Sequence, residues 1–214
     1  SSTSRLTVLP WYEEGGLHLL HSGFSFSYRI PNDSFARLRI RPESDLAARL
    51  TDTGAVNNNP TFTPVADNIR TYAVEQALVY GPFSLQGEMA YSYWKARTSR
   101  NFKSWYLLGS YFLTGEHRPY DPLTAEFGRV IPNKNFGANG GWGAWEAAAR
   151  WSYIDASDRF SGFGVGFANE IRDITVGVNW YMTPNTRIMF NWINVEHNIY
   201  GKMNIIQTRF QVDF

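Results

Sequence analysis

The feature that most constrains this chain is a strict alternation of polar and apolar residues through its last positions, 205–214. One parity carries Ile206, Thr208, Phe210, Val212 and Phe214, and the other carries Gln207, Arg209, Gln211 and Asp213. Successive side chains of a β-strand point to opposite faces, so this stretch would have one apolar and one polar face. A long strand that closes on a bare aromatic residue is typical of bacterial outer-membrane barrels, whose apolar residues face lipid. We therefore expect part of the wall of a membrane β-barrel.

The composition of the 214-residue chain fits that expectation and argues against other classes. No apolar run approaches the roughly 18 to 20 residues of a membrane helix, so a barrel is the remaining way to span lipid. Aromatic residues make up 16%, which suits two interfacial girdles. The net charge of +1 disfavours a nucleic-acid partner, and the lack of Cys excludes disulfides and thiolate metal sites. No cofactor is implied.

Strand signals recur along the whole length, separated by Gly, Pro and Asn. The predicted fold is all-β, a single antiparallel transmembrane β-barrel domain over residues 1–214. Its ten strands are expected near residues 5–13, 17–30, 35–43, 69–80, 83–95, 101–115, 143–154, 171–182, 186–197 and 203–214. Counting back from a last strand that ends at the periplasm, short periplasmic turns fall at 31–33, 80–83 and 182–185, and long outer loops at 44–68 and 155–170.

One segment breaks this alternation of short and long connections. Residues 116–142 contain three prolines and a Gly-rich end, and they fall at the periplasmic side, where turns are normally short. Unstructured connections of this length are usually functional. We expect this segment to fold into the lumen of the barrel.

Five motifs spread over the chain are distinctive: Arg37-Leu38-Arg39-Ile40-Arg41-Pro42-Glu43-Ser44, Tyr80-Gly81-Pro82-Phe83, Ile131-Pro132-Asn133-Lys134-Asn135-Phe136, Gly143-Ala144-Trp145-Glu146 with Arg150, and Asn179-Trp180-Tyr181 with Pro184-Asn185. Together they resemble the phosphate- and pyrophosphate-selective porin family. The resemblance implies a 16-stranded, homotrimeric barrel with inward-folded loops, one of them periplasmic, which would account for 116–142. Ten strands would then correspond to the C-terminal portion of a family member, without its main constriction loop.

The most specific chemical feature is a row of three arginines, Arg37, Arg39 and Arg41. On the predicted strand 35–43 they share one face, about 7 Å apart at roughly 3.4 Å per residue. A hairpin about residue 33 would place Arg29 opposite the first of them, with Ser27 and Ser25 opposite the next two. Guanidinium groups bind phosphate through a bidentate fork, and closely spaced weak sites allow an ion to pass along. The resemblance implies that this row lines the entry path of phosphate.

Other charged residues are candidates for the lumen. Arg129 and Lys134, in the long connection, are either anion ligands or ordinary solvated loop charges. Residues on inferred lumen faces are Glu75, Glu88, Glu146, Arg150, Asp173, Arg187 and Arg209. The two carboxylates of Glu75 and Glu88 are expected to be cross-strand neighbours, an arrangement that acid–base chemistry uses, but a charged pore wall is the better interpretation.

These observations predict a passive channel of the bacterial outer membrane for anions such as phosphate or polyphosphate, with no enzymatic activity and no catalytic or metal-binding residues. Lipid, lipopolysaccharide and a homotrimer are the expected partners. Three alternatives remain open from the sequence. They are an outer-membrane barrel enzyme of the protease or lipase type, a non-selective or structural barrel plugged by residues 116–142, and a soluble β-sandwich.

Overall fold

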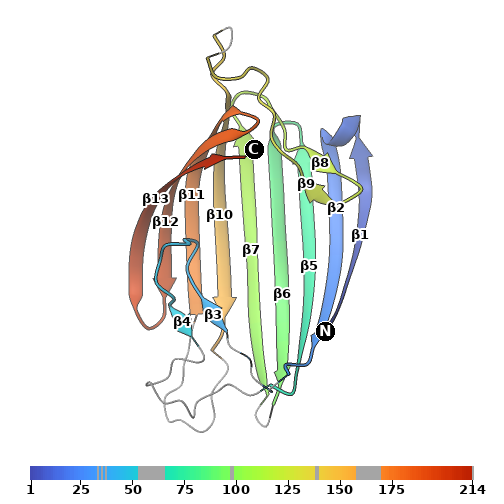
Figure 1. The fold of residues 1–214 in the computed structure, drawn as a ribbon, viewed down its shortest axis with the longest axis vertical. Helices are drawn as coiled ribbons and strands as arrows, with labels where there is room; N and C mark the ends of the chain where they lie inside the picture. Colours follow the sequence, from blue (N-terminus) through green and yellow to red (C-terminus); the bar gives the residue numbers. More distant parts are fainter. Residues whose placement is uncertain are drawn as a thin grey trace.

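The described part of the chain is dominated by one curved antiparallel sheet (Figure 1). The computed structural model describes residues 1–32, 34, 36, 38–52, 66–96, 99–137, 140–157 and 170–213. Within them the sheet has nine strands, each paired with the next: β1 (Ser2–Glu13), β2 (His18–Arg29), β5 (Asn68–Tyr80), β6 (Phe83–Lys95), β7 (Arg100–Phe112), β10 (Ala144–Asp155), β11 (Glu170–Thr183), β12 (Thr186–His197) and β13 (Gly201–Val212). Over the described residues β1 and β13 remain the two edges, so the sheet is open.

The strands form where the sequence alternates, and the alternation divides the sheet into two unlike faces. One row of register partners crosses the sheet as Glu75, Glu88, Tyr106, Ser152 and Asp173. We call this polar face the inner face. The neighbouring row begins Val74, Met89 and Trp105 and belongs to the outer face. Met89 is 56% exposed and Ile206 69% exposed, and large exposed apolar patches of this kind mark a surface covered by lipid or another protein.

The predicted strand 35–43 is wrong as a member of the sheet. Instead β2 pairs directly with β5, with Arg29 opposite Ile69, and residues 30–67 form one connection between them. Among its described residues that connection contains two short strands, β3 (Arg39–Ile40) and β4 (Thr51–Asp52), which pair with each other. The described residues thus contribute nine wall strands rather than ten, and residues 31 and 32 lie at the end of the sheet opposite to the one predicted.

The physical reason for this error lies in what the apolar residues of the segment touch. Leu38 and Ile40 alternate with arginines as lipid-facing residues would, but Ile40 packs against Ile171 and Ile193 on the inner face. Pro42, which has no backbone N–H to donate, follows Ile40 two positions later. We name residues 38–50 the inner loop, because they fold back along the inner face near β10 and β11 (Figure 1).

A second segment covers the inner face at the other end, where β13 finishes. We name residues 116–137 the mouth segment. It contains a small hairpin of β8 (Tyr120–Asp121) and β9 (Glu126–Phe127). Tyr120 is buried in a cluster with Leu19 and Val79, both on the inner faces of their strands. In Figure 1 this hairpin lies beside β2 and β5, far from the inner loop.

A three-residue 3-10 turn, η1 (Glu14–Gly16), connects β1 to β2. Among the described residues no helix has both the length and the apolar character required to cross a membrane.

Candidate functional site

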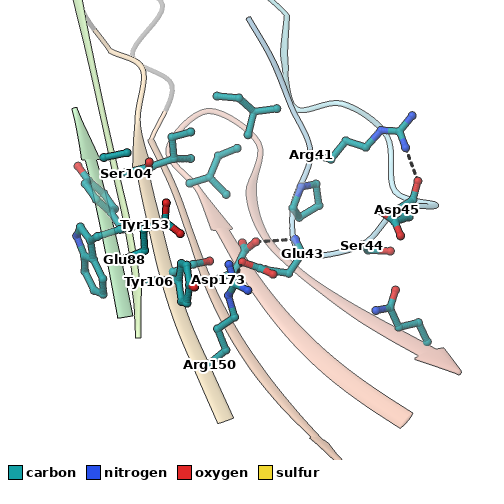
Figure 2. A pocket seen from close by; sticks show the side chains of 18 residues that line it. Arg41, Glu43, Ser44, Asp45, Glu88, Ser104, Tyr106, Arg150, Tyr153 and Asp173 are labelled. Atoms are coloured by element: carbon teal, nitrogen blue, oxygen red, sulfur yellow. Dashed lines mark hydrogen bonds and ion pairs between the residues drawn. The ribbon is translucent and has the colours of Figure 1, made fainter. Parts of the chain in front are cut away.

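A cavity of about 560 Å³ opens between the inner loop and the wall (Figure 2). The inner loop supplies Arg41, Glu43 and Asp45 to its lining. The strands supply polar residues of the inner face, including Glu88, Ser104, Tyr106, Arg150, Ser152 and Asp173. Charged groups of both signs therefore meet where the loop touches the wall.

The inner loop is fixed to this wall through Glu43. Its backbone N–H donates to Oδ2 of Asp173 at 2.8 Å, and its carboxylate lies 3.0 Å from Nε of Arg150. Nε has no well-aligned hydrogen-bond partner, so the Arg150 contact is an ion pair rather than a hydrogen bond. The Arg150 guanidinium also lies 4.0 Å from the centre of the Tyr106 ring. A carboxylate only 4% exposed, as Asp173 is, requires such a donor, because an unpaired buried charge is strongly unfavourable.

Two of the three predicted arginines are described, and both are exposed on the inner loop. Arg39 lies on β3, and Arg41 follows it and donates from Nη1 to the backbone oxygen of Asp45. Because Leu38 and Ile40 take the opposite parity and pack against the wall, the guanidiniums point away from that contact. Arg37 lies outside the described residues. The predicted alternation is therefore present here, but on a loop that folds onto the wall.

The predicted partners of the arginine row are placed differently. Arg29 is exposed at the end of β2, and its register partner is Ile69. Ser27 and Ser25 pair with Thr71 and Ala73 of β5. The prediction that these residues lie opposite the arginines is wrong, because the hairpin that it required does not form.

Glu75 and Glu88 are cross-strand register partners, as predicted from the sequence, but their surroundings differ. Glu88 lines the cavity beside the inner loop. Glu75 accepts from Nε of Arg5 at 2.8 Å, and its Oε1 lies 3.3 Å from Nε2 of His21. Gly23 is opposite Glu75, and a Cβ at that position would lie 2.2 Å from the same oxygen. This glycine therefore makes the room that the carboxylate occupies.

The remaining predicted wall residues fall into two groups. Glu146 is 5% exposed and accepts from Asn179 at 2.9 Å and from the Tyr181 hydroxyl at 2.8 Å, so it is a buried structural group. Arg187 donates to Gln211 across β12 and β13. Arg209 is exposed on β13, opposite Met189.

The mouth segment brings Arg129 to the turn between β11 and β12, where its Nη1 donates to Oδ1 of Asn185 at 2.8 Å. Lys134 is exposed, and its backbone oxygen accepts from Gly143 N at 3.2 Å. These two predicted ligands lie at the end of the sheet where β13 finishes. Arg39 and Arg41 lie instead on the connection between β2 and β5, which leaves the sheet at its other end. The structure does not bring the two groups together.

Sequence reasoning missed two residues of the mouth segment that anchor it. Arg118 donates to Oε1 of Gln86 at 3.1 Å and stacks 3.8 Å from the centre of the Phe127 ring. Burial lowers the pKa of the Arg118 guanidinium from its ordinary value. The Tyr120 hydroxyl meets Nδ1 of His21 at 2.6 Å, and burial raises the pKa of that hydroxyl. No periodic pattern marks either residue, because both act through tertiary contacts with strands distant in sequence.

Comparison with known proteins now identifies the family. A family described as phosphate-selective porin O and P matches residues 2–214. The chain belongs to this family. Porin O of Pseudomonas aeruginosa is 29% identical over 208 residues, which cover 87% of this chain and 45% of Porin O. An uncharacterised protein of Caulobacter vibrioides is 32% identical over 161 residues, which cover 72% of this chain and 30% of that protein. The chain thus spans less than half the length of these relatives.

Membership of the porin O and P family places the chain in the bacterial outer membrane. It also accounts for the two faces of the sheet. Exposed apolar side chains on the outer face, such as Met89 and Ile206, suit contact with lipid, and polar residues cover the inner face. The family is one of channels rather than enzymes.

Proposed function

We propose that this chain forms part of the wall and two inward folds of an outer-membrane channel that conducts anions passively, with phosphate preferred. The observation that carries the proposal is the inner loop, which presents the exposed guanidiniums of Arg39 and Arg41 while Glu43 holds it to Asp173 and Arg150. The name of the matching family, phosphate-selective porin O and P, supports phosphate as the preferred ion.

The chemistry of conduction follows from exposure. A guanidinium keeps its charge at any physiological pH and offers a bidentate fork to a phosphate oxygen pair. In contact with water such a site binds only moderately, which allows the ion to leave as well as to enter. The anchored backbone of the loop keeps the two arginines on one parity, so successive sites are about 7 Å apart by strand geometry.

The mouth segment supports a narrow pore at the other end. At one point its Arg118 contacts Gln86 on β6, and further along its Arg129 contacts Asn185 at the turn between β11 and β12. The segment therefore crosses from one part of the wall to another. We propose that the complete protein closes a 16-stranded barrel around these folds and assembles as a homotrimer among lipid and lipopolysaccharide. The family resemblance supports these assembly proposals.

Single-channel conductance in planar bilayers tests the proposal. Chloride current through the protein is measured while phosphate is added, and we expect a saturable block. The double variant Arg39→Gln/Arg41→Gln should raise the half-blocking phosphate concentration by about tenfold or more, the equivalent of about 1.4 kcal/mol.

A matched control is Arg70→Gln, which removes the same charge from an exposed arginine of the outer face, opposite Tyr93. This control should leave the block unchanged. Current without any phosphate block in the unsubstituted protein would reject anion selectivity and leave a general porin.

A further inference from the structure

A second basic cavity, of about 330 Å³, lies at the C-terminal end of the sheet, between the mouth segment and the turn of β11 and β12. Three arginines from separate stretches of the chain line it: Arg118 and Arg129 of the mouth segment and Arg187 of β12. Asp213 is the single acidic residue of the lining. The formal charge of the lining is therefore three positive against one negative.

Each of these guanidiniums is held by a neutral side-chain amide. Arg118 donates to Gln86 at 3.1 Å and Arg129 to Asn185 at 2.8 Å. Arg187 donates to Oε1 of Gln211 from Nε at 3.2 Å and from Nη2 at 2.9 Å.

Within the described residues none of the three arginines has a carboxylate in ion-pair range, which sets them apart from Arg5 and Arg150 of the same face. Arg5 lies 2.7 Å from Glu75, and Arg150 lies 3.0 Å from Glu43. Asp213 accepts from Gln211 Nε2 at 2.9 Å. An amide oxygen fixes the direction of a guanidinium without cancelling its charge, so the positive charge of the cavity persists.

The missing partner of such a cavity is an anion. A guanidinium has five N–H donors, and each amide contact here occupies only one or two of them. Arg118 is partly buried on the Phe127 ring, and Glu146 acts on its charge from beyond ion-pair range. A desolvated cation without a contacting counter-charge is stabilised when an anion approaches. A small polyvalent oxyanion with part of its hydration shell fits the volume, and three forks suit its several oxygens.

We propose that the cavity formed by Arg118, Arg129 and Arg187 is a second oxyanion site, at which phosphate dwells on the periplasmic side of the channel. This inference rests on the proposed function, because it requires a phosphate-conducting pore. It gives the channel a separate anion site for ions that enter from each side, which the inner loop alone does not provide. An ion from outside meets Arg39 and Arg41 first, and an ion from the periplasm meets Arg129 and Arg187 first, because the inner loop and the mouth segment lie toward opposite ends of the sheet (Figure 1).

The test measures phosphate block from each side of a planar bilayer separately. The chain has no Cys, so Ile199→Cys in the exposed turn between β12 and β13 provides a unique handle within it. A membrane-impermeant thiol reagent that reacts from one compartment then identifies the outer side of each inserted channel. Inorganic phosphate is the probe.

The double variant Arg129→Gln/Arg187→Gln should raise the half-blocking phosphate concentration from the periplasmic side by about tenfold, and from the outer side by less than about twofold. Arg129→Lys/Arg187→Lys keeps the charges but not the forks, and it should give an intermediate shift. Arg118 is left in place because its stacking on Phe127 anchors the mouth segment. Arg70→Gln is again the matched control.

The outcomes separate the two proposals. If the unsubstituted channel shows no phosphate block from either side, the proposed function itself fails. If phosphate blocks, and Arg39→Gln/Arg41→Gln weakens that block while Arg129→Gln/Arg187→Gln does not, only the second site is rejected. Equal shifts from both sides in the Arg129→Gln/Arg187→Gln variant would also reject it, because they would indicate a general loss of positive potential.

Discussion

The inner loop and the mouth segment both cover the inner face, but they differ in the partners of their charged side chains. In the inner loop Ile40 packs against the wall, and Glu43 adds an ion pair with Arg150 and a backbone hydrogen bond to Asp173. In the mouth segment the attachment is made by buried rings and neutral amides, with Tyr120 in a cluster with Leu19. The first segment therefore adds a charged attachment to its packing, whereas the second is held by packing and amide contacts and leaves Arg118 and Arg129 outside any ion pair.

The largest expected effect comes from removing the ring that holds the mouth segment. Tyr120→Ala deletes a buried aromatic side chain and should lower the free energy of unfolding by about 3 kcal/mol. Release of the segment should also raise single-channel conductance and expose Arg118 and Arg129 to trypsin. Tyr120→Phe keeps the packing and loses only the contact with His21, so its cost should be about 1 kcal/mol. Equal costs for the two variants would contradict the packing argument.

The corresponding test of the inner loop removes its buried acceptor. Asp173→Ala leaves the Glu43 N–H without its partner, and we expect a loss of about 2 kcal/mol in the free energy of unfolding. The half-blocking phosphate concentration should rise because the arginine row is no longer held. Asp173→Asn retains an oxygen that accepts from the same N–H, so phosphate block should be largely restored. If the Asn variant behaves like the Ala variant, the charge of Asp173, rather than its hydrogen bond, holds the loop.

A smaller effect is expected where the wall supports the mouth segment. Gly23→Ala would place a methyl group 2.2 Å from Glu75 Oε1, displace that carboxylate and cost about 1 to 2 kcal/mol in unfolding free energy. Because the clash is with Glu75 itself, Glu75→Ala should relieve it. The double variant should then cost less than the sum of the two single variants, as a double-mutant cycle of urea unfolding would measure. Strict additivity would mean that the strain lies in the backbone instead.

The smallest effect concerns the exposed part of the ionic attachment. Arg150→Gln removes the ion pair with Glu43. Because Arg150 is one-third exposed in this pair, the loss should lower the free energy of unfolding by only about 0.5 kcal/mol. Raising the salt concentration should reduce this cost further, because screening weakens exposed pairs. The same salt increase should leave the cost of Tyr120→Ala unchanged, which separates the two kinds of attachment in a single series of measurements.

Much of the wall was predictable because the side chains of a membrane strand alternate between an apolar and a polar face over its full length. Nine of the ten predicted strands are present, and the register of Glu75 with Glu88 followed from the position of the Gly81–Pro82 turn. The segment 35–43 was mistaken because Leu38 and Ile40 give the same alternation whether they meet lipid or the inner face of the wall. Local pattern contains no information about which apolar surface is available.

The candidate sites were less predictable for a related reason. Arg39 and Arg41 stood out because they are close in sequence and share one parity. The arginines at 118, 129 and 187 are separated along the chain, and they line one cavity only after the mouth segment crosses to β12. The anchoring role of Glu43 was not predictable either, since it depends on a backbone N–H directed at Asp173 and an ion pair with Arg150, both distant in sequence.

The amide partners of the second cavity make its charge easy to change. Gln86 differs from glutamate by a single isosteric replacement of a side-chain amide by a carboxylate, and the Tyr106 hydroxyl, which accepts from Gln86 Nε2 at 2.9 Å, can donate to a carboxylate instead. One such replacement would neutralise the guanidinium beside it. Relatives that share this wall can therefore diverge in the sign and strength of their inner charge through single substitutions, so ion preference is able to evolve independently of the fold.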